Sequence, residues 1–167
     1  MMETLTPVLI NQETLLPSLV AVEDVLLDGE PVVRVVKNVR EHEYGLRSCA
    51  VVPDCDFHNG VIEVHVRSRI LPDAPDLPNY TFAHFRAKGI TKYEARADIG
   101  LDEWIHVRIE VDGTQGKLYT NGVNVLSVED MKGRADAKGS IALFVDIGTE
   151  GFFKNLKVSH GDEKGCE

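Results

Sequence analysis

The chain has 167 residues, the length of one domain, and can bury a hydrophobic core without help from disulfides or metals. It carries 27 acidic and 18 basic residues, a formal net charge of −9, so we expect neither nucleic acid nor anionic lipid as a partner. No segment has the roughly 20 apolar residues that a membrane span needs. We expect a single domain over residues 1–160 and a disordered charged tail over residues 161–167.

The N-terminal segment lacks the basic start and unbroken apolar core of a signal peptide, since polar residues 11–13 and Pro17 interrupt it. We therefore expect a cytoplasmic protein, or a secreted one if a leader has been removed from the sequence. The three cysteines, Cys49, Cys55 and Cys166, lack the spacing of zinc ligands, which favours reduced thiols. A bridge between Cys49 and Cys55 is the less favoured alternative.

Short apolar or alternating runs, each followed by Gly, Pro, Asn or Asp, recur along the chain and predict antiparallel strands. About ten or eleven strands at this spacing are typical of a β-sandwich or barrel. A weak helical signal over residues 128–136 is interrupted by Gly133. The predicted strands cover residues 18–27, 32–39, 47–53, 60–71, 80–87, 92–99, 104–111, 116–122, 123–128, 139–147 and 151–159.

Residues 102–123 show the alternation most clearly. One parity is aliphatic and predicts the core face, whereas the other is mostly polar and predicts an exposed face. Asp112 and Gly113 are expected to supply the positive φ angles of a tight turn, and "NG" at 121–122 marks the next turn. The aliphatic set is Ile105, Val107, Ile109 and Val111, and the other set is Trp104, His106, Arg108, Glu110 and Asp112.

The same stretch resembles the W-x-x-V-x-x-x-x-D-G-x-x-G-x-x-Y-x-N-G pattern of the concanavalin A-like lectin/glucanase superfamily, especially its laminin G-like members. The resemblance covers about residues 57–158 and implies an all-β, two-sheet antiparallel β-sandwich, a jelly roll whose concave face often holds carbohydrate. Such proteins include lectins, noncatalytic modules, glycoside hydrolases and polysaccharide lyases. The Glu-x-Asp-x-x-Glu run of laminarinase-type hydrolases is absent. The match is carried by Trp104, Val107, Asp112, Gly113, Gly116, Tyr119, Asn121 and Gly122.

If the predicted strands are neighbours in one sheet, their polar side chains lie on the same face of that sheet. In strand 60–71, Ile62, Val64, Val66 and Ile70 are expected in the core. Arginines on the opposite face would bind sugar hydroxyls or carboxylates, with Phe144 as a stacking platform and Asp146 beside it. The alternative is a solvated sheet face with paired charges. The predicted ligand-binding residues are Glu63, His65, Arg67, His84, Arg86, Glu94, Arg96, His106, Arg108, Phe144 and Asp146.

A carbohydrate-binding module that uses this concave face is the favoured function. The first alternative is a glycoside hydrolase or lyase whose catalytic residues come from Glu63, Glu94, His65 and His84. The second is a noncatalytic interaction module, with a homodimer formed through a sheet edge. One groove built from Glu63, Arg86 and Phe144 requires that all three lie on the same face of the molecule.

Metals and cofactors are not predicted. His65, His84 and His106 share the polar parity, but no metal-ligand spacing supports a three-histidine site. The loop aspartates do not form the ordered series of a calcium site either.

Overall fold

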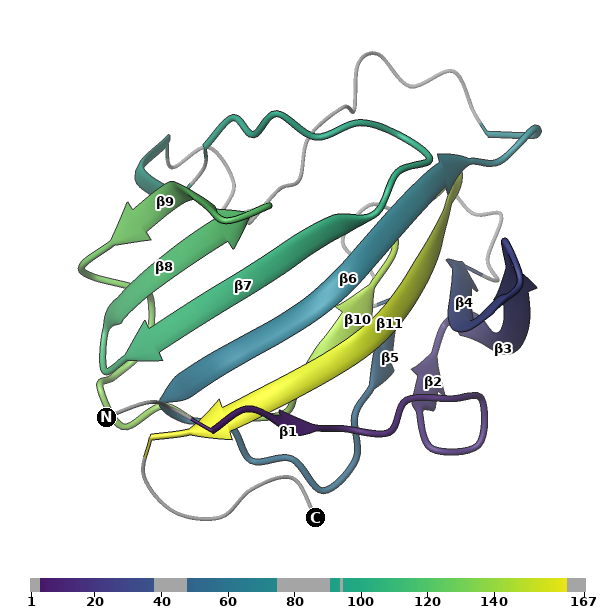
Figure 1. The fold of residues 1–167 in the computed structure, drawn as a ribbon. Coiled ribbons are helices and arrows are strands. Elements are labelled where there is room, and N and C mark those ends of the chain that lie inside the picture. The colour runs from purple at the N-terminus through teal and green to yellow at the C-terminus, as the bar shows by residue number, and fades with distance from the viewer. Residues whose placement is uncertain (1–3, 38–47, 75–90, 94, 162–167) are drawn as a thin grey trace.

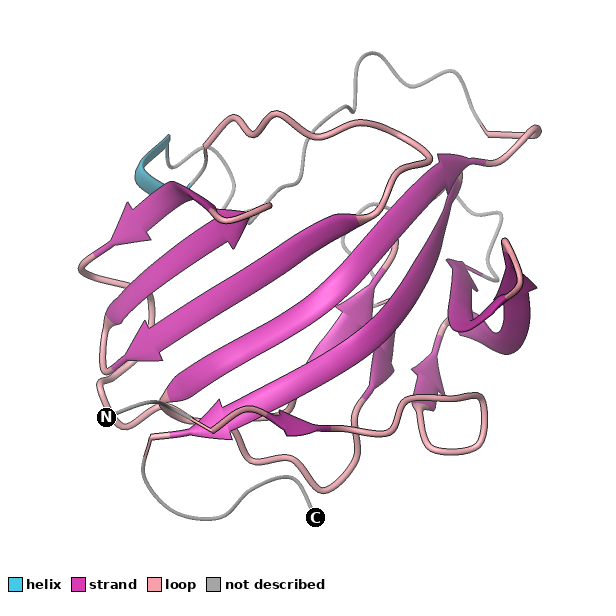
Figure 2. Cartoon of the chain, viewed as in Figure 1, coloured by secondary structure: helices cyan, strands magenta, loops and turns pink. Residues whose placement is uncertain are grey.

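The computed structural model describes residues 4–37, 48–74, 91–93 and 95–161, and the structural statements below refer to these residues. They form antiparallel strands and one 3₁₀ turn, η1 (Thr91–Tyr93) (Figures 1 and 2). The strands are β1 (Thr6–Pro7), β2 (Leu16–Ser18), β3 (Val20–Leu27), β4 (Glu30–Lys37), β5 (Cys49–Val51), β6 (Gly60–Ile70), β7 (Ile105–Asp112), β8 (Gln115–Thr120), β9 (Val123–Val128), β10 (Ala142–Phe144) and β11 (Thr149–His160).

The strands make two antiparallel sheets. The large sheet has the order β3-β4-β11-β6-β7-β8-β9, with β1 paired to the C-terminal half of β11. The small sheet has the order β10-β5-β2 and lies behind β6 and β11 in Figure 1. The predicted all-β, two-sheet antiparallel sandwich of the jelly-roll type is confirmed.

Tight turns join the consecutive hairpins of the large sheet. Asp28 and Gly29 between β3 and β4, and Asn121 and Gly122 between β8 and β9, all have positive φ angles, as type I′ turns require. Between β7 and β8 only Gly113 has a positive φ, 59°, because Asp112 is still part of β7. The "NG" turn was therefore predicted correctly, whereas the positive φ expected for Asp112 was wrong.

The hydrophobic core lies between the two sheets and follows the predicted parity of β6 and β7. Ile62, Val64 and Val66 of β6 pack into it together with Val107 of β7. Ile70, also predicted as core, is 60% exposed, because it is the last residue of β6 and the pairing with β7 ends at Val66. Other core residues are Val33, Val35, Ala50, Val52, Leu143, Val145, Phe153, Leu156 and Val158.

The predicted strand over residues 92–99 is wrong wherever this segment is described. Residues 91–93 form η1, and residues 95–99 have no regular structure. Lys92 and the Tyr93 hydroxyl both bind Asp130, which holds the segment against the loop after β9. Residues 129–136 form no helix. The predicted strand over residues 80–87 lies outside the described residues.

The two described cysteines differ in their chemical state. Cys49 in β5 is a free thiol, whereas Cys55 is disulfide-bonded and buried in the core. They are therefore not bridged to each other, and the prediction of a reduced thiol is wrong for Cys55. No helix in the described part of the chain is long and apolar enough to cross a bilayer.

Gly60 allows β6 and β11 to approach closely. Its φ is 136°, and a Cβ at this position would lie 2.0 Å from the carbonyl oxygen of Ser159. Because that oxygen belongs to the backbone, Gly60→Ala must move one strand relative to the other. We expect the free energy of unfolding, measured by urea denaturation, to fall by about 3 kcal/mol or more.

Gly122→Ala is the matched control for this substitution. Gly122 also has a positive φ, 82°, but no atom lies within 4 Å of a Cβ placed there. The variant should therefore lose only about 1 kcal/mol, the cost of the backbone conformation alone. Equal losses in the two variants would show that the close approach at Gly60 does not matter.

Candidate functional site

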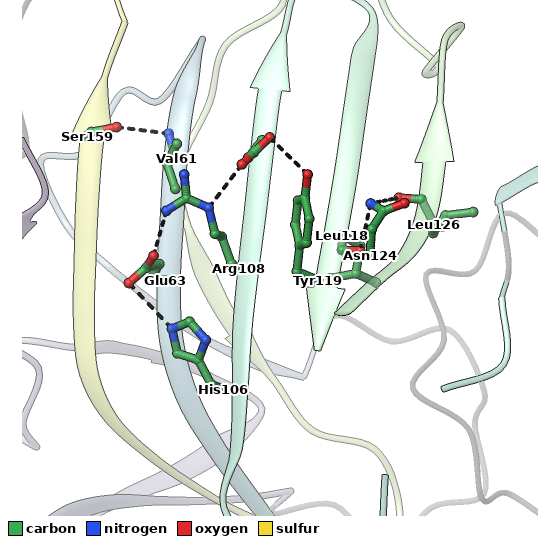
Figure 3. A network of polar contacts seen from close by, with 10 residues as sticks. Val61, Glu63, His106, Arg108, Leu118, Tyr119, Asn124, Leu126 and Ser159 are labelled. Carbon is green, nitrogen blue, oxygen red and sulfur yellow. Dashed lines mark hydrogen bonds and ion pairs between the residues drawn. The ribbon is translucent and has the colours of Figure 1, made fainter. Parts of the chain in front are cut away.

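The outer face of the large sheet, which points away from the small sheet, carries a network of polar side chains. The pairing of β6 with β7 places Glu63 opposite Arg108 and His65 opposite His106. Glu63 Oε1 accepts a hydrogen bond from Arg108 Nη1 at 2.6 Å, and Glu63 Oε2 lies 3.4 Å from His106 Nε2 (Figure 3). Two neighbouring strands thus direct a carboxylate, a guanidinium and an imidazole at one another.

Arg108 links this group to a second carboxylate. Its Nε donates to Glu110 Oε1 at 3.0 Å, and the Tyr119 hydroxyl of β8 donates to Glu110 Oε2 at 3.5 Å. One guanidinium therefore lies between two carboxylates, with about two-thirds or more of every participating charged side chain shielded from solvent. Such charge-assisted bonds hold the side chains in fixed positions.

The pKa of Glu63 is set by opposing effects. Burial raises it, but the hydrogen bonds from Arg108 and His106, together with their charges, outweigh burial and leave the pKa below its ordinary value. Glu63 is therefore ionised at neutral pH. It can accept hydrogen bonds and orient His106, but it cannot donate a proton to a leaving group.

His65 lies beside this network. Its ring is tilted against that of His106, with the centroids 5.1 Å apart, and Asn155 Nδ2 of β11 lies 3.4 Å from its Nδ1. Burial lowers the pKa of His65 most, and the charges of His106, Lys154 and Lys157 lower it further. His65 is therefore a neutral imidazole at pH 7, one that can donate or accept a hydrogen bond.

The β3–β4 hairpin folds over the outer face. Phe152 of β11 pairs with Arg34 of β4 on one side and with Arg67 of β6 on the other, so the two arginines lie at the same height along the sheet. Asp28 precedes Arg34 by six residues and lies in the turn at the end of the hairpin. At about 3.3 Å per residue, a flat sheet would separate Asp28 from Arg67 by some 20 Å. They instead form an ion pair of 2.9 Å, so this end of the sheet is curled and its outer face is concave (Figure 1).

The curled end is stabilised by apolar packing and further ion pairs. Leu27, Val32 and Phe152 are buried, and the half-buried Trp104 packs against them. Lys154 Nζ lies 4.2 Å from the centre of a Trp104 ring and 2.7 Å from Glu30 Oε2. Asp102 accepts from Arg67 and Arg69 at 2.8 and 2.6 Å. Aromatic and charged groups thus line the concave side next to His65.

The structure brings together five of the predicted site residues: Glu63, His65, Arg67, His106 and Arg108. His84, Arg86 and Glu94 lie outside the described residues. Arg96 is exposed in a segment without regular structure, so it is not part of the sheet face on which it was predicted.

Phe144 and Asp146 lie elsewhere. Phe144 belongs to β10 of the small sheet, where Leu143 and Val145 point into the core and the Phe144 side chain is 61% exposed on the opposite outer surface. Asp146 lies two residues after Phe144, and its Oδ1 is 3.9 Å from Lys37 Nζ. The predicted single groove containing Glu63 and Phe144 is therefore wrong. The alternation along a strand indicates which side chains avoid the core, but not which of the two sheets the strand joins.

Several residues of this face were not predicted to be site residues, among them Glu110, Tyr119, Lys154 and Asn155. Glu110 shares the parity of Arg108, so the alternation of β7 already contained that signal. Asn155 interrupts the alternation of "FFKNLKV", and this irregularity was the available sign of a special position. No cluster of three or more His, Cys, Asp or Glu side chains suited to a metal occurs among the described residues.

Comparison with known proteins assigns the chain to a family. Residues 70–159, more than half of the chain, match the model of the 3-keto-alpha-glucoside-1,2-lyase-like domain. The chain belongs to this family. The family match contains His106, Arg108 and Asn155, whereas Glu63 and His65 precede it. Membership of the 3-keto-alpha-glucoside-1,2-lyase-like family indicates a sugar-related function.

Other comparisons add little to the family assignment. No curated protein matches the chain. Among solved structures, a protein from Parabacteroides distasonis ATCC 8503, provisionally described as a glycosyl hydrolase, is 16% identical, with 83% of each chain covered and a TM-score of 0.48.

Replacing Arg108 by methionine should raise the pKa of Glu63. Because the pKa is lowered in the folded protein, Glu63 contributes stability above its unfolded value of about 4.3, and this contribution is lost as the pH falls through the folded value. In Arg108→Met burial acts with less opposition, so the contribution of Glu63 should be smaller and its loss should be complete at a higher pH. Carboxyl carbon NMR and urea denaturation between pH 3 and pH 7 would measure both effects.

Arg134→Met is the control, since Arg134 is 87% exposed and pairs only with Asp136 among the interactions described for it. It should leave the titration of Glu63 unchanged. An unchanged Glu63 titration in Arg108→Met would show that the 2.6 Å contact does not hold the carboxylate ionised.

Proposed function

We propose that the concave outer face of the large sheet binds a glucoside and that the protein cleaves it as a lyase. One observation carries the proposal: on adjacent strands, His106 lies 3.4 Å from an ionised Glu63, and the neutral His65 lies directly beside it. A carboxylate-oriented imidazole next to a neutral imidazole supplies both a base and a hydrogen-bond donor. The family match supports a sugar carrying a ketone at C3.

The chemistry follows from that ketone. A carbonyl at C3 makes the hydrogen on C2 acidic, so a base can remove it while the electron pair moves to the C3 oxygen as an enolate. The enolate then re-forms the ketone, the C1–C2 double bond forms, and the bond from C1 to the glycosidic oxygen breaks. The departing oxygen takes up the proton that the base removed. No oxidant or reductant is consumed.

The two histidines suit different steps of this elimination. With its Nε2–H directed at Glu63, His106 has a free Nδ1 lone pair to remove the C2 proton, as in other carboxylate–histidine pairs. Arg108 keeps Glu63 ionised throughout. His65, neutral because of its lowered pKa, donates a hydrogen bond to the C3 oxygen, where negative charge develops.

A glycoside hydrolase is less well supported by the same contacts. A hydrolase needs one carboxylic acid that is protonated at working pH to protonate the leaving oxygen. Arg108 binds both Glu63 and Glu110, and the pKa of Glu63 is lowered rather than raised. These groups therefore favour the elimination.

Noncatalytic sugar binding is the second candidate, and the sequence resemblance to concanavalin A-like, laminin G-like modules favours it. Arg67 and Arg69 are already paired with aspartates, and Lys154 with Glu30. Such a face presents fixed polar groups to hydroxyls, and it offers fewer unpaired cations to acidic sugars than the sequence predicted.

A chromogenic 3-keto-α-glucoside, such as the p-nitrophenyl compound, tests the proposal. We expect nitrophenol release by the wild-type protein, slowed by deuterium at C2. His106→Asn should lower kcat by about 10²- to 10⁴-fold, the usual effect of losing a general base, while calorimetry shows a Kd within a few-fold of wild type. Glu63→Gln should also lower kcat. Phe144→Ala, on the opposite surface, is the control and should behave as wild type.

Each other result identifies a different function. Release without a C2 isotope effect, with solvent oxygen incorporated at C1, would indicate a hydrolase. Tight binding of 3-keto and unoxidised glucosides without turnover would indicate a noncatalytic module. If neither sugar bound, the sugar-binding proposal would be wrong.

A further inference from the structure

We propose that Asn155 is a positioning residue that fixes the tautomer of His65. Its side-chain amide donates to His65 Nδ1, so that the ring carries its single proton on Nε2. The catalytic consequence rests on the proposed function, because the Nε2–H is the group that would bind the C3 oxygen of the sugar. The tautomer itself can be observed without any turnover.

Asn155 lies at an irregularity in β11. The pairing of β11 with β6 shifts between Lys154, which is opposite His65, and Lys157, which is opposite Glu63. Three steps along β11 therefore match two along β6, which defines a β-bulge. Asn155 has a φ of 56°, a left-handed conformation that costs free energy for any residue with a Cβ and that Asn tolerates better than most. Bulges of this kind redirect side chains, often beside active sites.

The bulge changes which side chains reach the outer face. Phe153 and Leu156 both point into the core, although they are three residues apart. A regular strand would alternate and place only one of these two in the core. The extra residue leaves Asn155 exposed, with its Nδ2 3.4 Å from His65 Nδ1. The strained backbone thus brings one amide to one imidazole nitrogen.

The contact separates the roles of the two histidines. A neutral imidazole has one N–H and one lone pair, so a donor at Nδ1 leaves the Nε2–H of His65 for a ligand. In His106 the Nε2 faces Glu63, which leaves the Nδ1 lone pair for a ligand. Both rings then carry the proton on Nε2, but His65 presents its Nε2–H as a donor to a ligand, whereas His106 presents its Nδ1 lone pair as an acceptor. Lys154 and Lys157, the other close groups on β11, are cations and cannot accept a hydrogen bond from His65, and the carboxylate of Glu30 on β4 is paired with Lys154.

Two substitutions separate the amide from the bulge. Asn155→Gly removes the amide but accepts the positive φ without a Cβ, so the folded protein should be as stable as wild type or slightly more stable. Asn155→Asp keeps the shape but replaces the donor by an acceptor. Asp54→Gly is the matched control, because Asp54 is exposed, has the same φ of 56° and lies in the loop between β5 and β6.

The readout is the ¹⁵N NMR spectrum of the histidine rings near pH 7.5, with His65 assigned from its loss in His65→Gln. We expect wild type and Asp54→Gly to show His65 protonated at Nε2, and Asn155→Gly to show a mixture of tautomers. Asn155→Asp should move the proton to Nδ1 and raise the pKa of His65, since a carboxylate favours the imidazolium. A purely structural role for Asn155 would leave these spectra unchanged.

Kinetics complete the test. With the p-nitrophenyl 3-keto-α-glucoside, Asn155→Gly should lower kcat about tenfold with little change in KM, and Asn155→Asp should also shift the pH profile. If the tautomers change as expected but wild type shows no turnover, the proposed reaction fails and the role of Asn155 stands. A His65 ring protonated at Nδ1 in wild type, or tautomers unaffected by both substitutions, would overturn the inference.

Discussion

The alternation of side chains along β6 determines both the core and the candidate site. This strand is hydrogen-bonded to β11 on one side and β7 on the other, so its register is constrained twice. A slip of one residue would bury Glu63 and His65 and expose Val64. The hydrophobic effect on the aliphatic positions therefore holds Glu63 opposite Arg108, and the polar network exists because the core on the other face is correctly packed.

The charges on the outer face are arranged mainly in pairs and triads. Arg67, Arg108 and Lys154 each contact at least one carboxylate, so their positions are set before any ligand arrives. This explains how a protein with a net charge of −9 can hold several cations close together on one surface. Burial and charged neighbours together determine protonation: Arg108 and His106 keep Glu63 charged against the effect of burial, whereas burial, with cations nearby, keeps His65 neutral. The face thus combines an ionised carboxylate and a neutral imidazole within one sheet.

The parts of the fold that depend on local chemistry were predicted well. Alternation predicted the strands β6 and β7 and their core-facing residues except Ile70, and the "NG" turn follows from residues that accept positive φ. The segment over residues 92–99 was mispredicted as a strand from its alternating sequence. Lys92 and Tyr93 bind Asp130 in the loop after β9 instead of pairing with a strand. The bulge at Asn155 was missed because one extra residue in a strand has no unique sequence pattern.

The sequence by itself determined that the chain folds into antiparallel strands, and that Glu63, His65, His106 and Arg108 avoid the core, because a period of two is a property of each strand alone. The tertiary structure decided which strands are neighbours. It put Phe144 on the opposite sheet, brought Asp28 over Arg67 and set Asn155 against His65. Those placements depend on contacts between segments distant in the chain, which residue order in one strand cannot encode.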